Sequence, residues 1–102
     1  MTTRVMPHPD YRAMTSAIAA IEMERQRQHS KWGCQHHDPV YWVGILTEEL
    51  GEVAREAIEL RPFAERGERT IEDSTARLRA ELVQLAAVAV AAIADLDLMP
   101  ID

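Results

Sequence analysis

The sequence predicts an all-α protein, a small helical bundle built from three helices. Apolar residues recur at the three- and four-residue spacing of a helix in three segments, and stretches that contain proline or glycine separate these segments. No stretch alternates between apolar and polar residues as a half-buried strand does. The length of 102 residues suits one domain that spans residues 1–102. Three helices of this size bury only a modest core, so we expect oligomerisation to complete the bundle.

The first helix is expected over about residues 11–29, after a loose N-terminal arm. Residues 1–9 contain two prolines and show no periodicity, and Asp10 is a suitable N-cap for a helix that follows. The apolar stripe of this helix comprises Met14, Ile18 and Ile21. The sequence S-K-W-G-C-Q-H-H-D at residues 30–38 then predicts a loop, because it breaks the apolar repeat and contains a glycine.

The second helix is expected over about residues 39–60. Asp38 is a typical N-cap, and Pro39 suits the first helical position because proline lacks the N–H that would be unpaired there. Pro62 is expected to stop the helix. Gly51, in mid-helix, either marks a close approach of another helix or simply costs helix stability, about 1 kcal/mol relative to alanine.

The third helix is expected over about residues 71–96. Thr70 and Asp73 resemble a capping box, with Asp in the place of the usual Glu. Residues 82–94 are apolar on almost every side, which is typical of a helix that is buried all round. One chain of this length has too few helices to bury such a segment, and this predicts a homo-oligomer.

The charge and the single cysteine restrict the class of protein. A net charge of −6 argues against a nucleic-acid-binding surface, which needs clustered Lys and Arg. Cys34 has no partner for an intrachain disulfide, which suits a reducing compartment. The N-terminus lacks the apolar region of a signal peptide, and residues 82–94 are too few to span a bilayer. We therefore expect a cytoplasmic protein that binds neither nucleic acid nor membrane.

The residues with the clearest chemical signal are acidic and lie on two of the predicted helices. Glu49 and Glu52 share one helix face, and so do Glu81 and Gln84 on the next helix. Glu49 falls inside an apolar arc of its helix, and Glu52 falls at the edge of that arc. The arc comprises Trp42, Ile45, Leu46, Leu50, Val53 and Ala57. Carboxylates among apolar side chains cost several kcal/mol unless they are compensated, and oxygen ligands select a hard ion such as Mg²⁺ or Mn²⁺.

These residues resemble a known motif pair. The sequence Glu48-Glu49-Leu50-Gly51-Glu52 matches E-E-x-x-E, and 81–84 (E-L-V-Q) matches E-x-x-D except at Gln84. Together with K-W-G-x-Q-H-H before the second helix and L-V-Q-L-A-A-V-A-V from residue 82, the chain resembles the MazG-like branch of the all-α nucleotide pyrophosphatase superfamily. The likeness covers about residues 22–98 and is strongest to small MazG-like proteins of phages and actinobacteria.

The resemblance implies a MazG-like helical bundle that hydrolyses nucleoside triphosphates, with deoxy forms favoured, to the monophosphate and pyrophosphate. Mg²⁺ would be the cofactor, with Mn²⁺ as a substitute. The resemblance also implies a homodimer or homotetramer, with sites where helices of two chains meet. The implied metal ligands are Glu49, Glu52, Glu81 and Gln84, although a glutamine carbonyl brings no charge.

Other residues have side chains that suit contact with the substrate or with the attacking water. Glu48, about 100° from Glu49 around the helix, would orient or deprotonate the attacking water. Lys31 would contact phosphate, because it is a cation just before the acidic helix. The flat rings of Trp32 and Trp42 offer faces for a base, and Gln35 and His37 could touch the nucleotide.

Each of these assignments has an ordinary structural alternative. The acidic residues could form a solvated or salt-bridged face with Arg55, Arg77 and Arg79, and Gln84 could be a buried amide bonded to a neighbouring helix. Trp42 could belong to the core, which is the more common position of such a residue. Asp95 lies on the same face as Glu81 but more than about two turns away, so we do not expect both to bind one ion.

The sequence suggests two alternative functions and one alternative metal site. The first is a non-catalytic or catalytically weakened nucleotide-binding module, in which Gln84 replaces a needed carboxylate. The second, a di-iron bundle, needs Glu-x-x-His pairs that the two acidic patches lack. The third, a zinc site from His29, Cys34, His36 and His37, has a spacing that matches no common zinc pattern.

Overall fold

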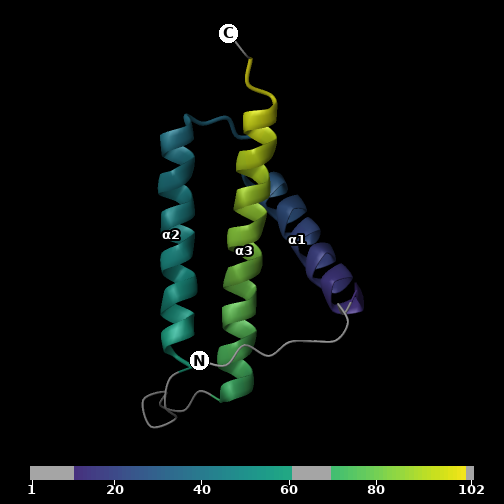
Figure 1. The fold of residues 1–102 in the computed structure, drawn as a ribbon, viewed down its shortest axis with the longest axis vertical. Coiled ribbons are helices and arrows are strands. Elements are labelled where there is room, and N and C mark those ends of the chain that lie inside the picture. The colour runs from purple at the N-terminus through teal and green to yellow at the C-terminus, as the bar shows by residue number, and fades with distance from the viewer. Residues whose placement is uncertain (1–10, 61–69, 101–102) are drawn as a thin grey trace.

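The computed structural model describes residues 11–60 and 70–100, and these residues form an all-α bundle (Figure 1). The helices are α1 (Tyr11–Trp32), α2 (Pro39–Ile58) and α3 (Ile71–Asp97), and the described ranges contain no strand. The predicted all-α class is therefore confirmed. The predicted arm at residues 1–9, the Asp10 cap and the stop at Pro62 lie outside the described residues.

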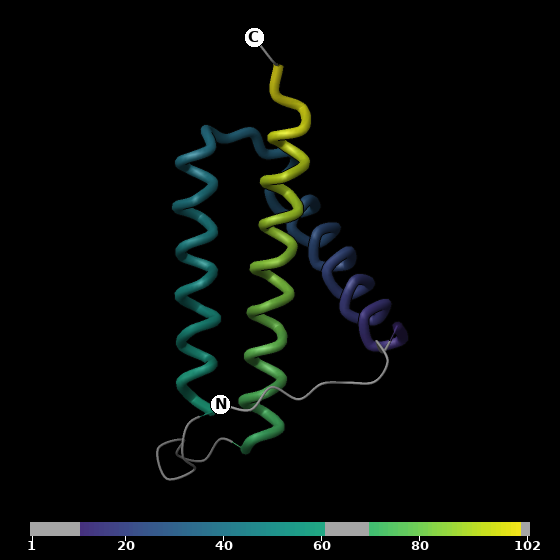
Figure 2. The backbone as a smooth tube through the Cα atoms, in the orientation of Figure 1, coloured from purple at the N-terminus to yellow at the C-terminus, as the bar shows by residue number. Residues whose placement is uncertain are grey.

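Helix α3 is the central element, because both other helices pack against it. Helices α2 and α3 run side by side in opposite directions, and α1 crosses α3 obliquely near the C-terminal half of α3 (Figures 1 and 2). Within the described residues, no Cα atom of α1 lies within 8 Å of a Cα atom of α2. The connection of residues 33–38 passes over the C-terminal part of α3, so this end of the bundle brings three helices and a loop together.

The starts of α2 and α3 follow the predicted capping chemistry. Asp38 precedes Pro39 and its Oδ1 accepts a 2.8 Å hydrogen bond from the backbone N–H of Val40. Thr70 precedes α3 and its Oγ1 accepts a 3.0 Å hydrogen bond from the backbone N–H of Asp73. Such caps satisfy backbone donors that a helix leaves unpaired in its first turn, so these starts are encoded locally.

Helix α1 is longer than predicted, because it continues past His29 to Trp32. Its end is set by Gly33, whose φ of 74° is readily reached by glycine, and whose N–H donates a 2.7 Å hydrogen bond to the carbonyl of His29. No helix-breaking residue precedes this glycine. Lys31 and Trp32 therefore lie on the last turn of a helix and not in a loop.

The core of one chain is small. Trp42, Val88 and Ala92 form the central cluster, while Leu50 of the predicted apolar arc is 55 % exposed. Other buried apolar residues are Val53 and Ala87, and Ile45, Leu46 and Ala91 pack against the cluster. A single chain therefore leaves a large part of its apolar side-chain surface uncovered.

The apolar faces expected to be buried remain partly exposed on α1 and α3. Met14 and Ile18 are 51 % and 55 % exposed, and Ile93 is 59 % exposed. The full burial expected for residues 82–94 is thus not achieved by one chain, because α1 and α2 cover only part of the α3 surface. Within the described ranges, none of the helices has the length and hydropathy needed to cross a membrane.

Candidate functional site

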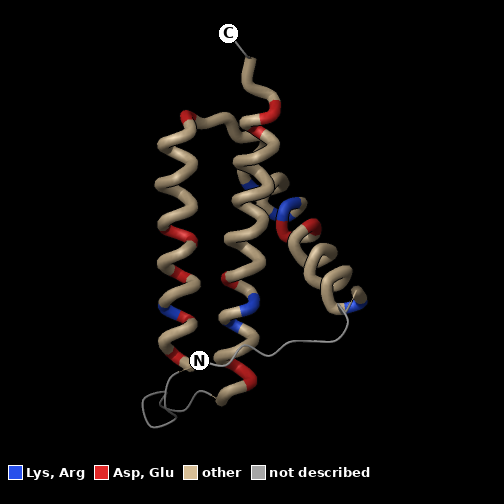
Figure 3. Tube along the Cα trace, viewed as in Figure 1, with Lys and Arg blue, Asp and Glu red and all other residues tan. Residues whose placement is uncertain are grey.

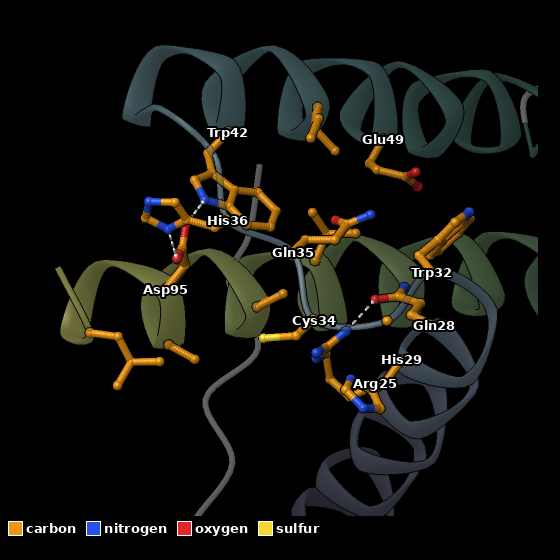
Figure 4. A pocket seen from close by; sticks show the side chains of 16 residues that line it. Arg25, Gln28, His29, Trp32, Cys34, Gln35, His36, Trp42, Glu49 and Asp95 are labelled. Atoms are coloured by element: carbon orange, nitrogen blue, oxygen red, sulfur yellow. Dashed lines mark hydrogen bonds and ion pairs between the residues drawn. The ribbon is translucent and has the colours of Figure 1, made fainter.

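A cavity of about 380 Å³ lies where α1, α2, α3 and the 33–38 connection meet (Figure 4). Four of its lining residues were predicted as site residues, namely Trp32, Gln35, Trp42 and Glu49. Its volume falls in the range of small-molecule sites, roughly 300–1,000 Å³. Helix α3 contributes mainly apolar side chains to the lining, and α1 contributes mainly polar ones, a mixture that is usual in ligand pockets.

Asp95 closes one end of this cavity. Its Oδ2 accepts hydrogen bonds from the indole Nε1 of Trp42 at 2.8 Å and from the backbone N–H of His37 at 2.9 Å, and its Oδ1 lies 2.6 Å from Nδ1 of His36. The hydrogen bond with His36, followed by those from His37 and Trp42, lowers the pKa of Asp95 to about 2. The 5 % exposed carboxylate therefore fixes the 33–38 connection on α3.

Helix α1 supplies one wall of the cavity through four residues on one helix face. Arg25, Gln28, His29 and Trp32 all line the cavity, and their spacing places them on the same side of α1. Gln28 is only 4 % exposed. Its Nε2 donates a 3.1 Å hydrogen bond to Oε2 of Glu24, and its Oε1 accepts a 3.2 Å hydrogen bond from Nη1 of Arg25.

Glu49 projects from α2 at the edge of the cavity (Figure 4). Desolvation raises its pKa most, followed by the negative charges of Glu81, Glu52, Glu48 and Glu24. These carboxylates come from all three helices, and Figure 3 shows acidic residues at mid-length of both α2 and α3. The structure therefore places the two predicted acidic patches near one another, across the α2–α3 contact.

Glu81 carries a further sign of an incomplete site. Its Oε2 is buried and has no hydrogen-bond partner. Burial raises the pKa of Glu81 most, the charges of Glu52 and Glu56 raise it further, and Arg55 opposes this effect. A buried carboxylate oxygen without a partner is costly, so this oxygen is suited to a cation or another donor.

Within residues 11–60 and 70–100, the alternative of a salt-bridged acidic face is seen at Glu52 and not at Glu49 or Glu81. Arg55 Nη1 lies 3.5 Å from Glu52 Oε2, and both side chains are about half exposed or more, at 72 % and 48 %. Exposed pairs of this kind contribute little to stability. Arg77 and Arg79 form no ion pair with a residue that the structure describes.

The predicted metal ligands lie near one another, but their side chains are not arranged to hold one ion. Among residues 11–60 and 70–100, no three His, Cys, Asp or Glu side chains lie close enough together to hold one ion. Gln84 is half-buried one turn after Glu81. The donor chemistry of Glu49, Glu52 and Glu81 suits a hard divalent cation, but side chains must move, or further ligands must arrive, to complete its coordination.

The predicted aromatic residues differ in accessibility. Trp32 lines the cavity and is 51 % exposed, so one face is open to a ligand. Trp42 also borders the cavity, but it is 3 % exposed and its N–H is committed to Asp95. The core alternative for Trp42 therefore describes it better than the open base platform, because the helix face that carries it packs directly on α3.

Six predicted residues do not line the cavity, namely Glu52, Glu81 and Gln84 of the acidic patches, and Lys31, His37 and Glu48. The Lys31 Nζ lies 4.9 Å from the centre of the Trp32 ring, on the last turn of α1. The His37 ring stacks near Tyr41, with centroids 4.6 Å apart, and its exposure is intermediate. Glu48 is exposed and borders a second hollow beside Tyr41, on another side of α2.

Several residues of the site were missed by the sequence argument. Arg25, Gln28 and Glu24 form a polar group on α1, and His36 and Asp95 anchor the connection. The helical spacing of the α1 group was a usable signal, as was one carboxylate near the end of a long apolar segment. Their shared location could not be found from spacing alone, because it depends on where α1 crosses α3.

Comparison of the chain with protein families, curated proteins and solved structures found no match. The resemblance to MazG-like proteins therefore stays an expectation that rests on the motif residues. The cavity, its acidic edge and the Asp95 anchor are properties of this chain itself, and the functional argument is built on them.

Proposed function

We propose that the protein is a Mg²⁺-dependent nucleoside triphosphate pyrophosphohydrolase, which converts a (d)NTP and water to the (d)NMP and pyrophosphate. One observation carries this proposal: Glu49, whose pKa is raised by burial and by neighbouring carboxylates that include Glu81, lines the 380 Å³ cavity. Perturbed carboxyl groups beside a cleft are candidates for function. The cavity is the proposed place of the nucleoside, and the carboxylates are the proposed place of the metal and phosphates.

The proposed roles follow from donor chemistry. Glu49, Glu52 and Glu81 would hold the cation, with the carbonyl oxygen of Gln84 as a neutral fourth ligand. When bound, Mg²⁺ would neutralise the charge of the triphosphate and favour attack by water, which is most of what phosphoryl transfer requires. The unpartnered Oε2 of Glu81 supports this assignment, because a cation would satisfy it.

The remaining roles position the nucleotide. Trp32 would stack on the base, since it is a half-exposed ring on the cavity wall, and Gln35 would contact the nucleoside from the connection. Glu48 would hold or deprotonate the attacking water only after its side chain turns from the second hollow toward Glu49. Lys31 would reach the phosphates only after leaving its position over Trp32.

A homo-oligomer is part of the proposal. Exposed apolar residues on all three helices support it, because large exposed apolar patches usually mark interaction sites. A second copy of the chain would bring a further set of acidic residues, because every copy carries the same patch. The homodimer or homotetramer would thus complete both the core and the metal coordination.

The decisive experiment is pyrophosphate release from a panel of NTPs and dNTPs, with Mg²⁺, with Mn²⁺ and with EDTA. We expect metal-dependent release that is reduced at least about a hundredfold in Glu49→Gln, a loss typical of a removed transition-state contact. Glu72→Gln is the matched control, because Glu72 lies in the exposed first turn of α3, away from the cavity. Equal activity of the wild type and Glu49→Gln would contradict the assignment of Glu49 to the active site.

A nucleotide-binding module with weak or absent catalysis is the second candidate. It is favoured by Gln84, and by the lack of three preassembled ligand groups among the described residues. Nucleotide binding in the cavity, measured by quenching of Trp32 fluorescence, without pyrophosphate release under any metal condition would establish this alternative.

A further inference from the structure

Arg25 is a cation that faces the cavity with most of its donors unused. It is partly buried, it lines the cavity, and its Nη1 donates one hydrogen bond of 3.2 Å to Gln28. It forms no ion pair with a residue in the described ranges. A guanidinium group carries five N–H donors and no acceptor, so the free side of Arg25 can bind only a group that accepts hydrogen bonds.

The orientation of Arg25 is set by a chain of hydrogen bonds along α1. Arg27 donates two hydrogen bonds, of 2.8 and 2.7 Å, to the two carboxylate oxygens of Glu24. Glu24 also accepts from Nε2 of Gln28, so the Oε1 of this buried amide is the atom that faces Arg25. Since Gln28 is 4 % exposed, its amide has little freedom to turn, and Arg25 is held with its remaining donors directed elsewhere.

The position of Arg25 relative to Glu49 indicates which part of a nucleotide it meets. Figure 4 shows Arg25 and Glu49 on opposite sides of the cavity, with Gln35 and Trp32 between them. If the phosphates lie at the acidic edge, as the proposed function requires, the base extends past Trp32 toward Arg25. A base edge, and not a phosphate, is then the nearest acceptor.

Resting on this proposed function, we infer that Arg25 makes the cavity selective for bases with a carbonyl at the recognised edge. Guanine presents O6 and N7 as acceptors, and thymine and uracil present O4, whereas adenine and cytosine present an amino donor at the same position. When a guanidinium faces an amino group, neither group offers an acceptor, so the N–H groups of both are left unpaired. Such a mismatch is penalised strongly in a site built for a hydrogen bond.

The inference is tested by binding of nucleoside monophosphates, so that hydrolysis is not needed. Isothermal titration without metal would compare dGMP with dAMP and dTMP with dCMP. We expect the oxo-base nucleotides to bind at least about tenfold more tightly than their amino counterparts. Arg25→Met keeps the approximate side-chain length but has no donor. In this variant the Kd values of the two nucleotides in each pair should differ by no more than about twofold. Arg79→Met, on the exposed side of α3, is the matched control and should keep the wild-type preference.

Circular dichroism melts would show whether each variant is folded. If Arg25→Met does not fold, Arg25→Lys answers the same question, because lysine keeps the charge but lacks the planar array of N–H donors. The preference of Arg25→Lys for oxo bases should also be weaker than that of the wild type. Equal binding of both members of each pair by the wild type would overturn the inference. The inference would also be overturned if Arg25→Met lost affinity equally for all four bases and lost more for triphosphates than for monophosphates, since Arg25 would then contact phosphate.

The failure of this inference differs from failure of the proposed function. Pyrophosphate release without a base preference leaves the enzyme intact and removes the role of Arg25. Selective monophosphate binding that Arg25→Met abolishes, without pyrophosphate release, keeps the role of Arg25 and makes the protein a nucleotide-binding module.

Discussion

The indole Nε1 of Trp42 donates a 2.8 Å hydrogen bond to Oδ2 of Asp95, a residue 53 positions later in the sequence. This contact joins the first turn of α2 to the last turns of α3. The same carboxylate binds the backbone of His37 and the ring of His36. One buried side chain therefore fixes the relative position of two helices and of the loop that closes the cavity.

Replacing Asp95 should weaken the fold and open the cavity. Asp95→Ala would leave the donors of Trp42 and His37 without their acceptor, and buried unpaired donors are costly. We expect the melting temperature to fall by at least about 4 °C and the Trp42 emission to shift to the red. Asp97→Ala, at an exposed position two residues later, is the control. An unchanged melting temperature in Asp95→Ala would show that this network does not hold the fold.

Divalent metal should stabilise the protein more at neutral pH than at acidic pH. The pKa values of Glu49 and Glu81 are raised above the ordinary value of 4.5, chiefly by desolvation. Their contribution to stability is therefore present below about pH 4.5 and is lost as the pH rises through the raised values. At pH 7, Mg²⁺ at a hundred times its Kd should add about 2.7 kcal/mol.

Thermal melts with and without Mg²⁺ between pH 5 and pH 8 would check this dependence. Glu81→Gln should raise stability in the metal-free protein at neutral pH and should reduce the response to Mg²⁺, because it removes the charge that the metal compensates. A Mg²⁺ response that is the same at all pH values, or the same in Glu81→Gln, would contradict the assignment.

Gln84 is the position where a carboxylate should strengthen the site. Gln84→Asp would add a charged oxygen one turn after Glu81, so we expect Mg²⁺ affinity and pyrophosphate release to rise by about tenfold. Gln84→Asn is the matched control, since it shortens the side chain equally without a charge. If Gln84→Asp and Gln84→Asn have the same Mg²⁺ affinity and the same rate of pyrophosphate release, position 84 does not face the cation. Glu81 would then be the last metal ligand of the motif in this chain.

The sequence predicted the helices well because their signals are local. The caps at Asp38 and Thr70 act within three residues, and both are present in the structure. The predicted end of α1 at His29 is three residues too early, because residues 30–32 continue the helix and Gly33 ends it. Local polarity is a weaker determinant of a helix end than backbone conformation.

The candidate site was predicted only in part, because half of it depends on tertiary packing. Glu49 and Glu81 were found from spacing, since each lies within a helix whose apolar face points toward the other. The contributions of Arg25 and Gln28 depend on the crossing of α1 over α3, which no periodicity specifies. Asp95 was considered only as a metal ligand, and its role as an acceptor for Trp42 follows from the antiparallel pairing of α2 and α3.

Gly51 tests whether a second chain approaches α2. In one chain, a Cβ at Gly51 would meet no atom within 4 Å. Gly51→Ala should therefore stabilise an isolated chain by about 1 kcal/mol, because alanine favours the helix. A lower melting temperature combined with weaker association would mean that another copy packs closely there, which is the close approach that the sequence allowed. Gly44→Ala, also without a neighbour within 4 Å, provides the comparison on the same helix.

Oligomerisation itself should depend on the exposed apolar face of α3. Ile93 is 59 % exposed although it lies within the most apolar segment of the chain. If a second copy covers it, Ile93→Glu would bury a charge at the interface and should shift the mass measured by light scattering toward the monomer. Glu72→Lys, on the exposed first turn of the same helix, should leave the mass unchanged. A wild-type protein that is monomeric at high concentration would rule out oligomerisation as the means of completing the core, and the metal would then need all its protein ligands from one chain.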